Sequence, residues 1–516
     1  MYILKSTKFT KNSKKEQISK IFLRNDFLVY LLHDKVVCSM CDELKEEIEK
    51  AKTLGRNARR KKERELQKKY KDKSIRILNG KTFSKGEAID RSERRNLVKD
   101  KDLLCEIFKI INKYLPQLTP LISELTDKRN KSYITYKIRT IVMTRLFALI
   151  CGITTMTEMN TKFNKEEAIQ NLSLICNQNL KEVPDWQTIQ DVIEQLDIKE
   201  IEDIRKYIVK ALIRSKMFDK YRYNGAFQLL VDATGISSHD YNLNGNCIMK
   251  KSKNGIIKYY KQVLEAKIVV GKIVISLDTE WIENADMMTE KKKQDCEINA
   301  FKRMAPRIKK NYPKLKFIIT GDALYATAPM IDICRNNNWH YIFNLKKDRL
   351  KQVYEQFEDN VNYKNETTKE NYKLSTNIKF KENILSALSY QEIQKNKLVT
   401  FNYITDLKVN DYKIETIVAM GRRRWKIENE GFNEQKNGTF RISHLCSRNE
   451  NALKVHYYFI QIAHIIRQLL EQGSILLREM KLKTKKEISY TITNTLISQP
   501  SDLNNLETNF QLRFDD

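Results

Sequence analysis

The chain is 516 residues long, 41% of its residues are hydrophobic, and its formal net charge is +29. The hydrophobic fraction excludes a chain that is disordered throughout, and the length allows two to four domains, each with its own core. The large positive charge favours a polyanionic partner such as a nucleic acid, because each neutralised phosphate releases counterions.

A membrane surface is the second kind of partner that such a charge suits. However, no apolar run reaches the roughly 20 residues that a spanning helix needs. The best candidate, residues 141–154, is interrupted by Arg145. The first residues are basic but lack the apolar stretch of a secretory signal, and the nine scattered cysteines are typical of reduced thiols. We therefore expect a cytoplasmic protein without membrane contact.

Residues 1–100 form a basic, polar N-terminal region. Between residues 52 and 76 there are twelve basic and three acidic residues, with few apolar positions, and this run predicts a helix. Its charge has two interpretations, a solvated helix face or a contact with the DNA backbone, and both stay open at this point.

Residues 101–222 follow a helical pattern. Leu103, Ile107 and Ile110 recur at helix spacing. Pro184 followed by Asp185 is typical of a helix start. We expect an α-helical domain here, ahead of the catalytic one.

Residues 223–345 change to short apolar runs bounded by glycine and other turn residues. They predict the order β-β-β-α-β-α-β, which fits a mixed sheet flanked by helices, as in ribonuclease H-like folds. The predicted strands are 227–231, 263–270, 272–277, 317–320 and 340–345, and the predicted helices are 289–310 and 329–336.

The rest of the chain completes an α+β multidomain protein. Residues 346–415 are polar and weakly periodic, with strands expected at 401–405 and 414–418, and we interpret them as an inserted β-rich subdomain. Residues 416–482 return to the ribonuclease H-like core, with helices expected at 422–436 and 452–470. Residues 483–516 read as a polar C-terminal tail with little packing.

Three carboxylates are the candidate catalytic residues. Asp232 and Asp322 end two buried-looking strands, and Glu428 lies on an arginine-rich helix. Two Mg²⁺ ions roughly 4 Å apart, held by such oxygen ligands, stabilise both the attacking and the leaving oxygen in phosphodiester cleavage. Spacing alone is weak support, because 65 acidic residues offer many triples and aspartate is common at strand ends for turn reasons.

Basic residues surround the third carboxylate. Arg424 lies four residues before Glu428 and shares a helix face with it. The cations either stabilise this helix or bind DNA phosphates. The candidate DNA-binding residues on this helix are Arg422, Arg423, Arg424 and Lys436. Trp425 and Phe432 are expected to face the core.

A second basic segment has lysines next to aromatic residues. Lys258 and Lys261 flank Tyr259 and Tyr260, which suits DNA contact. An exposed strand face is the alternative interpretation.

Several segments together resemble the DDE transposases of bacterial insertion sequences, in the cut-and-paste group with a β-rich insertion before the last glutamate. The matching segments are VPDWQTIQDVIEQLD, VDATGISS, YYKQVLEAKIV, VISLDTEWIEN, KQDCEINAFKRMA, GDALYA and RRRWKIENEGFNEQKNG. The resemblance implies a ribonuclease H-like core, a pair of Mg²⁺ or Mn²⁺ ions, cutting at transposon ends and strand transfer into target DNA. It also implies double-stranded DNA as partner, a homodimer on paired ends, end binding or pairing by the helical domain, and association with the bacterial nucleoid.

The family's carboxylate triad corresponds to Asp232, Asp322 and Glu428, with Glu430 as a rival for the third place. Its helix signature of Tyr, Arg, Glu and Lys fits less well. Arg424 matches, whereas Gly421 stands at the tyrosine position. Gln435 stands at the lysine position, with Lys436 one step late. A transposase-derived DNA-binding protein that no longer cuts, and a plain metal-dependent nuclease, are therefore the alternative functions.

Overall fold

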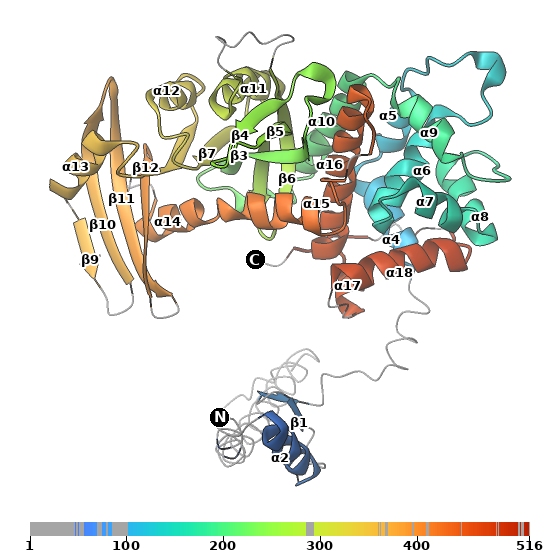
Figure 1. The fold of residues 1–516 in the computed structure, drawn as a ribbon, viewed down its shortest axis with the longest axis horizontal. Coiled ribbons are helices and arrows are strands. Elements are labelled where there is room, and N and C mark those ends of the chain that lie inside the picture. The colour runs from blue at the N-terminus through green and yellow to red at the C-terminus, as the bar shows by residue number, and fades with distance from the viewer. Residues whose placement is uncertain are drawn as a thin grey trace, which may run out of the picture. The chain divides into compact units, whose positions relative to one another are not determined.

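The computed structural model describes residues 102–284 and 294–514, with short gaps in the second range, together with 47, 50, 56–69, 75–78 and 81–84. The chain divides into two compact units, Met1–Lys99 and Asp100–Asp516. Figure 1 shows their elements.

In the first unit, the basic run predicted to be helical forms helix α2, Arg56–Lys69. The helix is shorter than the predicted one, because its last residues enter an antiparallel hairpin. The hairpin joins β1, Ile75–Leu78, to β2, Lys81–Ser84. Leu66 is buried, whereas most described cations of α2 are exposed.

The second unit begins with helices, as the apolar periodicity predicted. They are α4 Leu103–Tyr114, α5 Leu118–Ser123, α6 Ile138–Cys151, α7 Met156–Phe163, α8 Glu166–Cys176, α9 Trp186–Ile193 and α10 Ile198–Arg214. Side chains of Asp102, Asp185 and Asp197 accept backbone N–H groups at three helix starts, which satisfies otherwise unpaired donors. Helix α6 is mostly apolar and buried almost throughout, so it forms the centre of this helical layer.

Among the described residues, no single helix has the length and apolar character to cross a membrane. Helices α6 and α7 meet that criterion only as a pair, and the chain bends by 99° between them.

A mixed sheet forms the centre of the second unit, which makes this unit α+β. Its strands are β3 Ala226–His239, β4 Ile248–Lys251, β5 Ile257–Val270, β6 Ile273–Ile282, β7 Lys316–Gly321, β8 His340–Asn344, β9 Tyr363–Glu366, β10 Glu370–Phe380, β11 Asn383–Gln394 and β12 Lys397–Thr405. Their order is β4-β5-β3-β7-β8-β12-β11-β10-β9, and β6 pairs with β5. The β3–β7 and β7–β8 pairs are parallel, and the other pairs are antiparallel.

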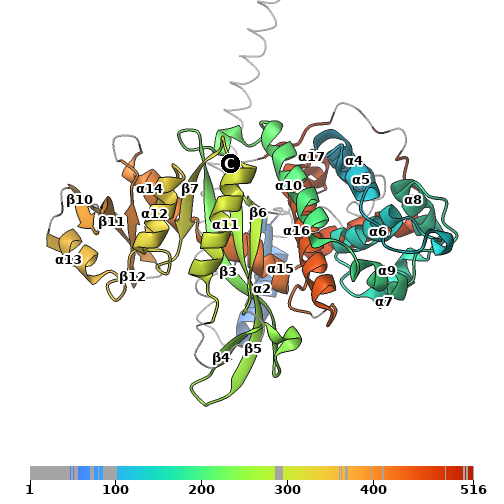
Figure 2. The same ribbon diagram turned by 90° about the horizontal axis from the view of Figure 1, so that it is seen from above.

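Helices cover both faces of this sheet. Figures 1 and 2 show α11, Glu297–Asn311, and α12, Ala328–Asn336, on one side of the strands. Helix α14, Ile414–Arg422, and α15, Glu434–Asn437, lie on the other side. A π-helix, Ile427–Asn433, leads directly into α15.

The region interpreted as an inserted subdomain contains helix α13, Lys351–Asp359, and strands β9 to β12. These strands extend the core sheet, because β12 pairs with β8. The strand expected at 414–418 is instead the start of α14. The buried residues Ile414, Ile417, Val418 and Gly421 follow helical spacing, and a strand would need alternation.

The C-terminal part is more ordered than the sequence suggested. The helix expected at 452–470 is α16, Glu450–Gly473, followed by α17, Ile475–Glu479, and α18, Lys485–Ser498. Helix α18 begins with a capping box between Thr484 and Glu487. It packs against α4, α6 and α8 and buries residues such as Ile492 and Leu496. The structure thus differs from the expected tail, because part of the segment completes the helical layer.

Candidate active site

Strand pairing places Asp232 and Asp322 side by side. In the parallel β3–β7 pair, Ala226 faces Lys316 and Leu230 faces Thr320, a constant offset of 90 residues. The same offset separates the two aspartates, each of which lies two residues beyond the last pair, Leu230 and Thr320. Neighbouring strands lie about 4.8 Å apart, and residues in register point to the same face. Both carboxylates therefore lie at the same end of the parallel pair, next to the C-terminal end of β7; we call this end the carboxylate edge.

The backbone around Asp322 turns sharply. Its side chain accepts the N–H of Leu324 at 2.8 Å, and its carbonyl accepts the N–H of Tyr325 at 3.1 Å. Gly321 allows this turn, because a Cβ there would lie 2.8 Å from the ring of Tyr325. A buried strand followed by this tight turn leaves a carboxylate at the sheet edge.

The π-helix brings Glu428 to the same edge. Ile427 and Phe432 are buried in one cluster with Leu230 of β3. Leu230 lies two residues before Asp232, so this packing holds the π-helix next to the part of β3 that carries Asp232. The charges of Asp322 and Glu428 both raise the pKa of Asp232, which indicates that both carboxylates lie near Asp232. π-helical turns are frequent at functional sites.

The pKa of Asp232 is raised to about 6, and burial of the carboxylate is the main cause. Arg424 opposes this effect, since its Nη1 lies 3.3 Å from Asp232 Oδ2. The guanidinium is itself buried, and it stacks 4.4 Å from the ring centroid of Trp425. In this structure Arg424, proposed as a phosphate ligand, is the counter-ion of Asp232.

The donor set suits a hard divalent cation, because three carboxylates supply the oxygen ligands that Mg²⁺ and Mn²⁺ prefer. The crowding of negative charge that raises the pKa of Asp232 is also what a cation would relieve. Among the described residues, however, no group of three acidic, histidine or cysteine side chains is already arranged around a metal position. The three carboxylates are suitable ligands for these metals, and in this structure the positive charge beside Asp232 is that of Arg424.

Glu430, the rival third ligand, has a different environment. Glu430 Oε1 forms an ion pair with Lys426 Nζ at 3.4 Å, whereas the charge of Glu428 raises the pKa of Asp232. This difference favours Glu428.

A fourth carboxylate was missed by the sequence reasoning. Glu297, at the start of α11, has its pKa raised to about 7 by burial and then by the charges of Asp232 and Asp322. Tyr325 Oη donates a hydrogen bond to Glu297 Oε2 at 3.2 Å. The sequence signal is the segment KQDCE, in which Glu297 follows Cys296, the exposed residue at the cap of α11.

The two lysines proposed on β5 have opposite environments. Lys258 is exposed, as DNA contact requires. Lys261 is 1% exposed, and its Nζ donates to Asn246 Oδ1. The prediction of a DNA contact by Lys261 is therefore wrong. An odd separation of three residues places the two side chains on opposite faces of a strand.

The arginines before the π-helix attach it to the sheet. Arg422 Nη2 lies 2.7 Å from Glu392 Oε1 of β11, and its guanidinium lies over the ring of Phe401. Arg423 is half-buried beside the ring of Tyr223, and burial lowers its pKa. These contacts give both arginines a packing role in this structure.

The other signature positions are explained by packing. Gly421 has no room for a side chain, because a Cβ would lie 2.5 Å from the ring of Tyr403 on β12. Gln435 is fully buried and donates to Gln461 at 2.9 Å, while Lys436 is partly exposed. Phe432 is buried as predicted, but Trp425 is 54% exposed, contrary to the expectation.

Comparisons with known proteins agree with this architecture. A family model described as "Transposase DDE domain" matches residues 228–466, which include all three carboxylates and the elements that position them. A second, described as "DDE_Tnp_1-associated", matches residues 120–207, from α5 into α10. No curated protein matches the chain.

Proposed function

Because this chain belongs to the DDE transposases of the insertion-sequence type, we propose that it cuts DNA at transposon ends and joins the freed strand to target DNA. Asp232, Asp322 and Glu428 would hold two Mg²⁺ or Mn²⁺ ions for this chemistry. The observation that carries the proposal is the register of β3 and β7, which aligns Asp232 with Asp322, together with the electrostatic effect of Glu428 on Asp232.

Bound divalent ions would activate the attacking oxygen and neutralise charge on the leaving oxygen. The protein residues prepare this state. If Asp232 holds metal, Arg424 would no longer be its counter-ion, and its guanidinium would be available to donate two parallel hydrogen bonds to a DNA phosphate. Tyr325 orients Glu297 at the side of the aspartates. Glu297 can exchange a proton near neutral pH, since its pKa is about 7.

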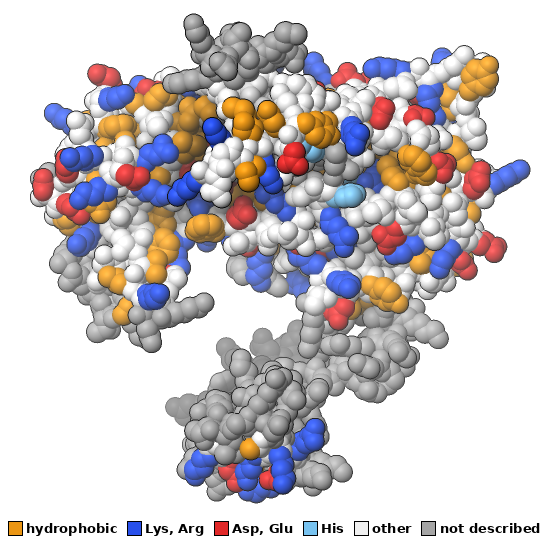
Figure 3. Space-filling model, viewed as in Figure 1, with side chains coloured by type: hydrophobic (Ala, Val, Ile, Leu, Met, Phe, Trp, Pro, Cys, Tyr) orange, Lys and Arg blue, Asp and Glu red, His pale blue; other side chains and the backbone are white. Residues whose placement is uncertain are grey.

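Double-stranded DNA is the proposed substrate, supported by the formal charge of +29. Lysine and arginine side chains gather on the surface between β12 and β7 (Figure 3). Exposed Lys258 on β5 and partly exposed Lys436 on α15 are the remaining proposed phosphate contacts. A homodimer on paired ends is part of the proposal, on the strength of the family alone.

A DNA-binding protein that no longer cuts is the second candidate. It is favoured by the buried Gln435 at the lysine position and by the ion pair between Arg424 and Asp232. The ion pair places a cation where a metal would bind Asp232, and Gln435 lacks the positive charge of the family's lysine.

One assay separates these functions. Purified protein is incubated with Mg²⁺, a supercoiled donor plasmid carrying the DNA that flanks the gene, and target DNA. Joined products support the transposase, cut but unjoined DNA supports a nuclease, and binding without cutting supports the second candidate. Asp232→Asn should abolish cutting and leave DNA affinity near that of the wild type. Asp203→Asn, at an exposed ion pair on α10, is the matched control and should cut normally.

A further inference from the structure

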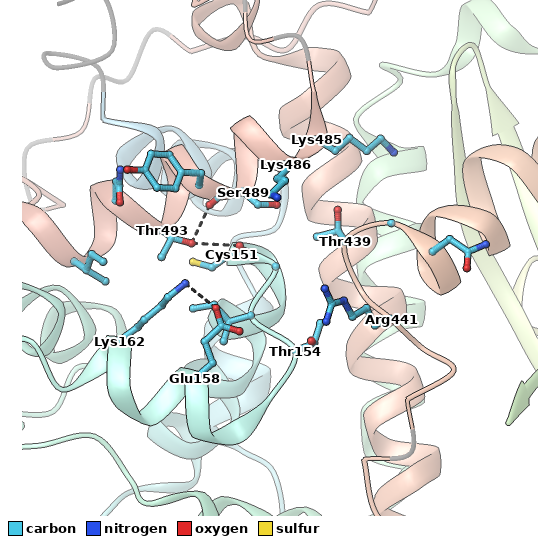
Figure 4. Close-up of a pocket in the computed structure, with 17 residues that line it drawn as sticks. Cys151, Thr154, Glu158, Lys162, Thr439, Arg441, Lys485, Lys486, Ser489 and Thr493 are labelled. Atoms are coloured by element: carbon cyan, nitrogen blue, oxygen red, sulfur yellow. Dashed lines mark hydrogen bonds and ion pairs between the residues drawn. The ribbon is translucent and has the colours of Figure 1, made fainter. Parts of the chain in front are cut away.

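A polar cavity of about 700 Å³ lies outside the carboxylate site. Its walls come from the end of α6, from α7, from the loop after α15 and from α18 (Figure 4). Helix α18 therefore packs against the helical layer and also forms one side of this cavity.

Four basic side chains and one carboxylate line this cavity. Lys162 pairs with that carboxylate, Glu158, at 2.7 Å, and Lys485 pairs with Glu434 at 2.9 Å. Arg441 and Lys486 form no ion pair with any described residue. Figure 4 shows their side chains approaching the cavity from two different elements. The lining therefore carries uncompensated positive charge.

A buried arginine behind the wall adds to this charge. Arg145 is 1% exposed and donates to the carbonyl of Thr154, a cavity residue, at 3.3 Å. Its Nε and Nη1 have no partner among the described residues, and burial lowers its pKa to about 10. Burying a cation without a carboxylate is costly, and an anion in the adjacent cavity would offset that cost.

The cavity lies at the end of the helical segment that carries Glu428. Asn437, at the end of α15, lines the cavity, and the same helical segment carries Glu428. Nine positions of this continuous π- and α-helical segment separate the two residues. Partly exposed Lys436 lies just before the cavity. Tyr490, 68% exposed at its rim, offers a ring on which a base can stack.

We propose that this cavity binds backbone phosphates of the DNA strand that extends from the cleavage position, with Arg441 and Lys486 as the direct contacts. The inference rests on the proposed function for the origin of that strand. The site itself is defined by its charge, its volume and its position at the end of the helix that carries Glu428.

The test uses the full chain and a fluorescent DNA duplex carrying the flanking repeat, without divalent ions, so that binding is measured apart from cutting. Affinity is measured over a series of salt concentrations for wild type and for the double variant Arg441→Gln/Lys486→Gln. Each lost phosphate contact should reduce the slope of log affinity against log salt by about 0.9. The magnitude of this slope should therefore be smaller by about 1.8 in the double variant than in the wild type. The double variant should also bind at least several-fold more weakly at low salt.

Two control variants make the result specific. Lys314→Gln removes an exposed cation just before β7, at the strand end opposite Asp322, and should leave the slope unchanged. Arg441→Lys/Lys486→Arg keeps both charges and should keep the wild-type slope. An unchanged slope in the double glutamine variant would overturn the proposal, as would an equal loss in Lys314→Gln. Cutting by the wild type in Mg²⁺, assayed separately, tests the transposase function whatever the cavity does.

Discussion

At the scale of single residues, the site is a set of carboxylates held close together at some cost. Burial and the neighbouring charges of Asp322 and Glu428 raise the pKa of Asp232 to about 6, and Arg424 only partly offsets them. The position of Asp322 directly after a strand could be recognised from the sequence, whereas Asp232 lies within β3, Ala226–His239, and not at its end as predicted. Glu297 could not be assigned, because its role depends on Tyr325 and on the two aspartates, which only the tertiary fold brings near it.

The raised pKa of Asp232 predicts that its charge destabilises the folded protein. A carboxyl whose pKa is higher in the folded than in the unfolded state binds its proton more tightly when folded, so stability falls as pH rises from about 4 to about 6. Asp232→Asn should therefore raise the free energy of unfolding near pH 7 by up to about 3 kcal/mol, and by little below about pH 4. Denaturant titrations of both proteins at the two pH values measure this, and equal stability near pH 7 would contradict it.

The hydrogen bond from Tyr325 lowers the pKa of Glu297, although burial raises it more. Tyr325→Phe removes the donor and should move the pKa of Glu297 above 7. If Glu297 acts ionised, the rising limb of the pH–rate profile for cutting shifts to higher pH. Glu297→Gln should remove this limb. A profile identical to that of the wild type in both variants would leave Glu297 without a part in the reaction.

At the scale of elements, the segment from α14 to α15 is the part whose local structure matters most for the site. The sequence predicted its buried Phe432 and its basic residues. It did not predict that 414–418 would be helical, since a short apolar run fits both periodicities until its partners are known. Lys261 was misplaced for a related reason, because alternation along β5 decides which lysine is exposed. Helix α18 was not predicted because nine of its fourteen residues are polar, and the faces of α4, α6 and α8 decide which side it buries.

The ring of Tyr403 on β12 occupies the space beside Gly421 of α14. We therefore predict that only one of these two positions can carry an aromatic ring. Gly421→Tyr should destabilise the protein by more than about 1 kcal/mol through overpacking, although tyrosine is the residue that the family signature has there. The double variant Gly421→Tyr/Tyr403→Gly should recover part of the loss, because one ring replaces the other. Thermal unfolding of the two variants measures the coupling, and strictly additive losses would argue against a shared space.

At the scale of the whole molecule, the second unit combines a mixed sheet, which carries the carboxylates, with helices that close its faces. The sequence predicted this division because strand and helix periodicities change sharply near residue 224. It could not predict that β9 to β12 extend the same sheet, since the β12–β8 pair joins residues about 60 positions apart. Nor could it predict the basic cavity, whose residues come from four separate segments.

The proposed function depends on Asp232, Asp322 and Glu428 holding divalent ions together. Crystals of the protein with end DNA and Mn²⁺ would test it most directly, by anomalous scattering at the manganese edge. We expect two manganese peaks about 4 Å apart beside Asp232, Asp322 and Glu428, with Arg424 moved away from Asp232. Manganese bound elsewhere, or no peak at these carboxylates while Arg424 still pairs with Asp232, would contradict it.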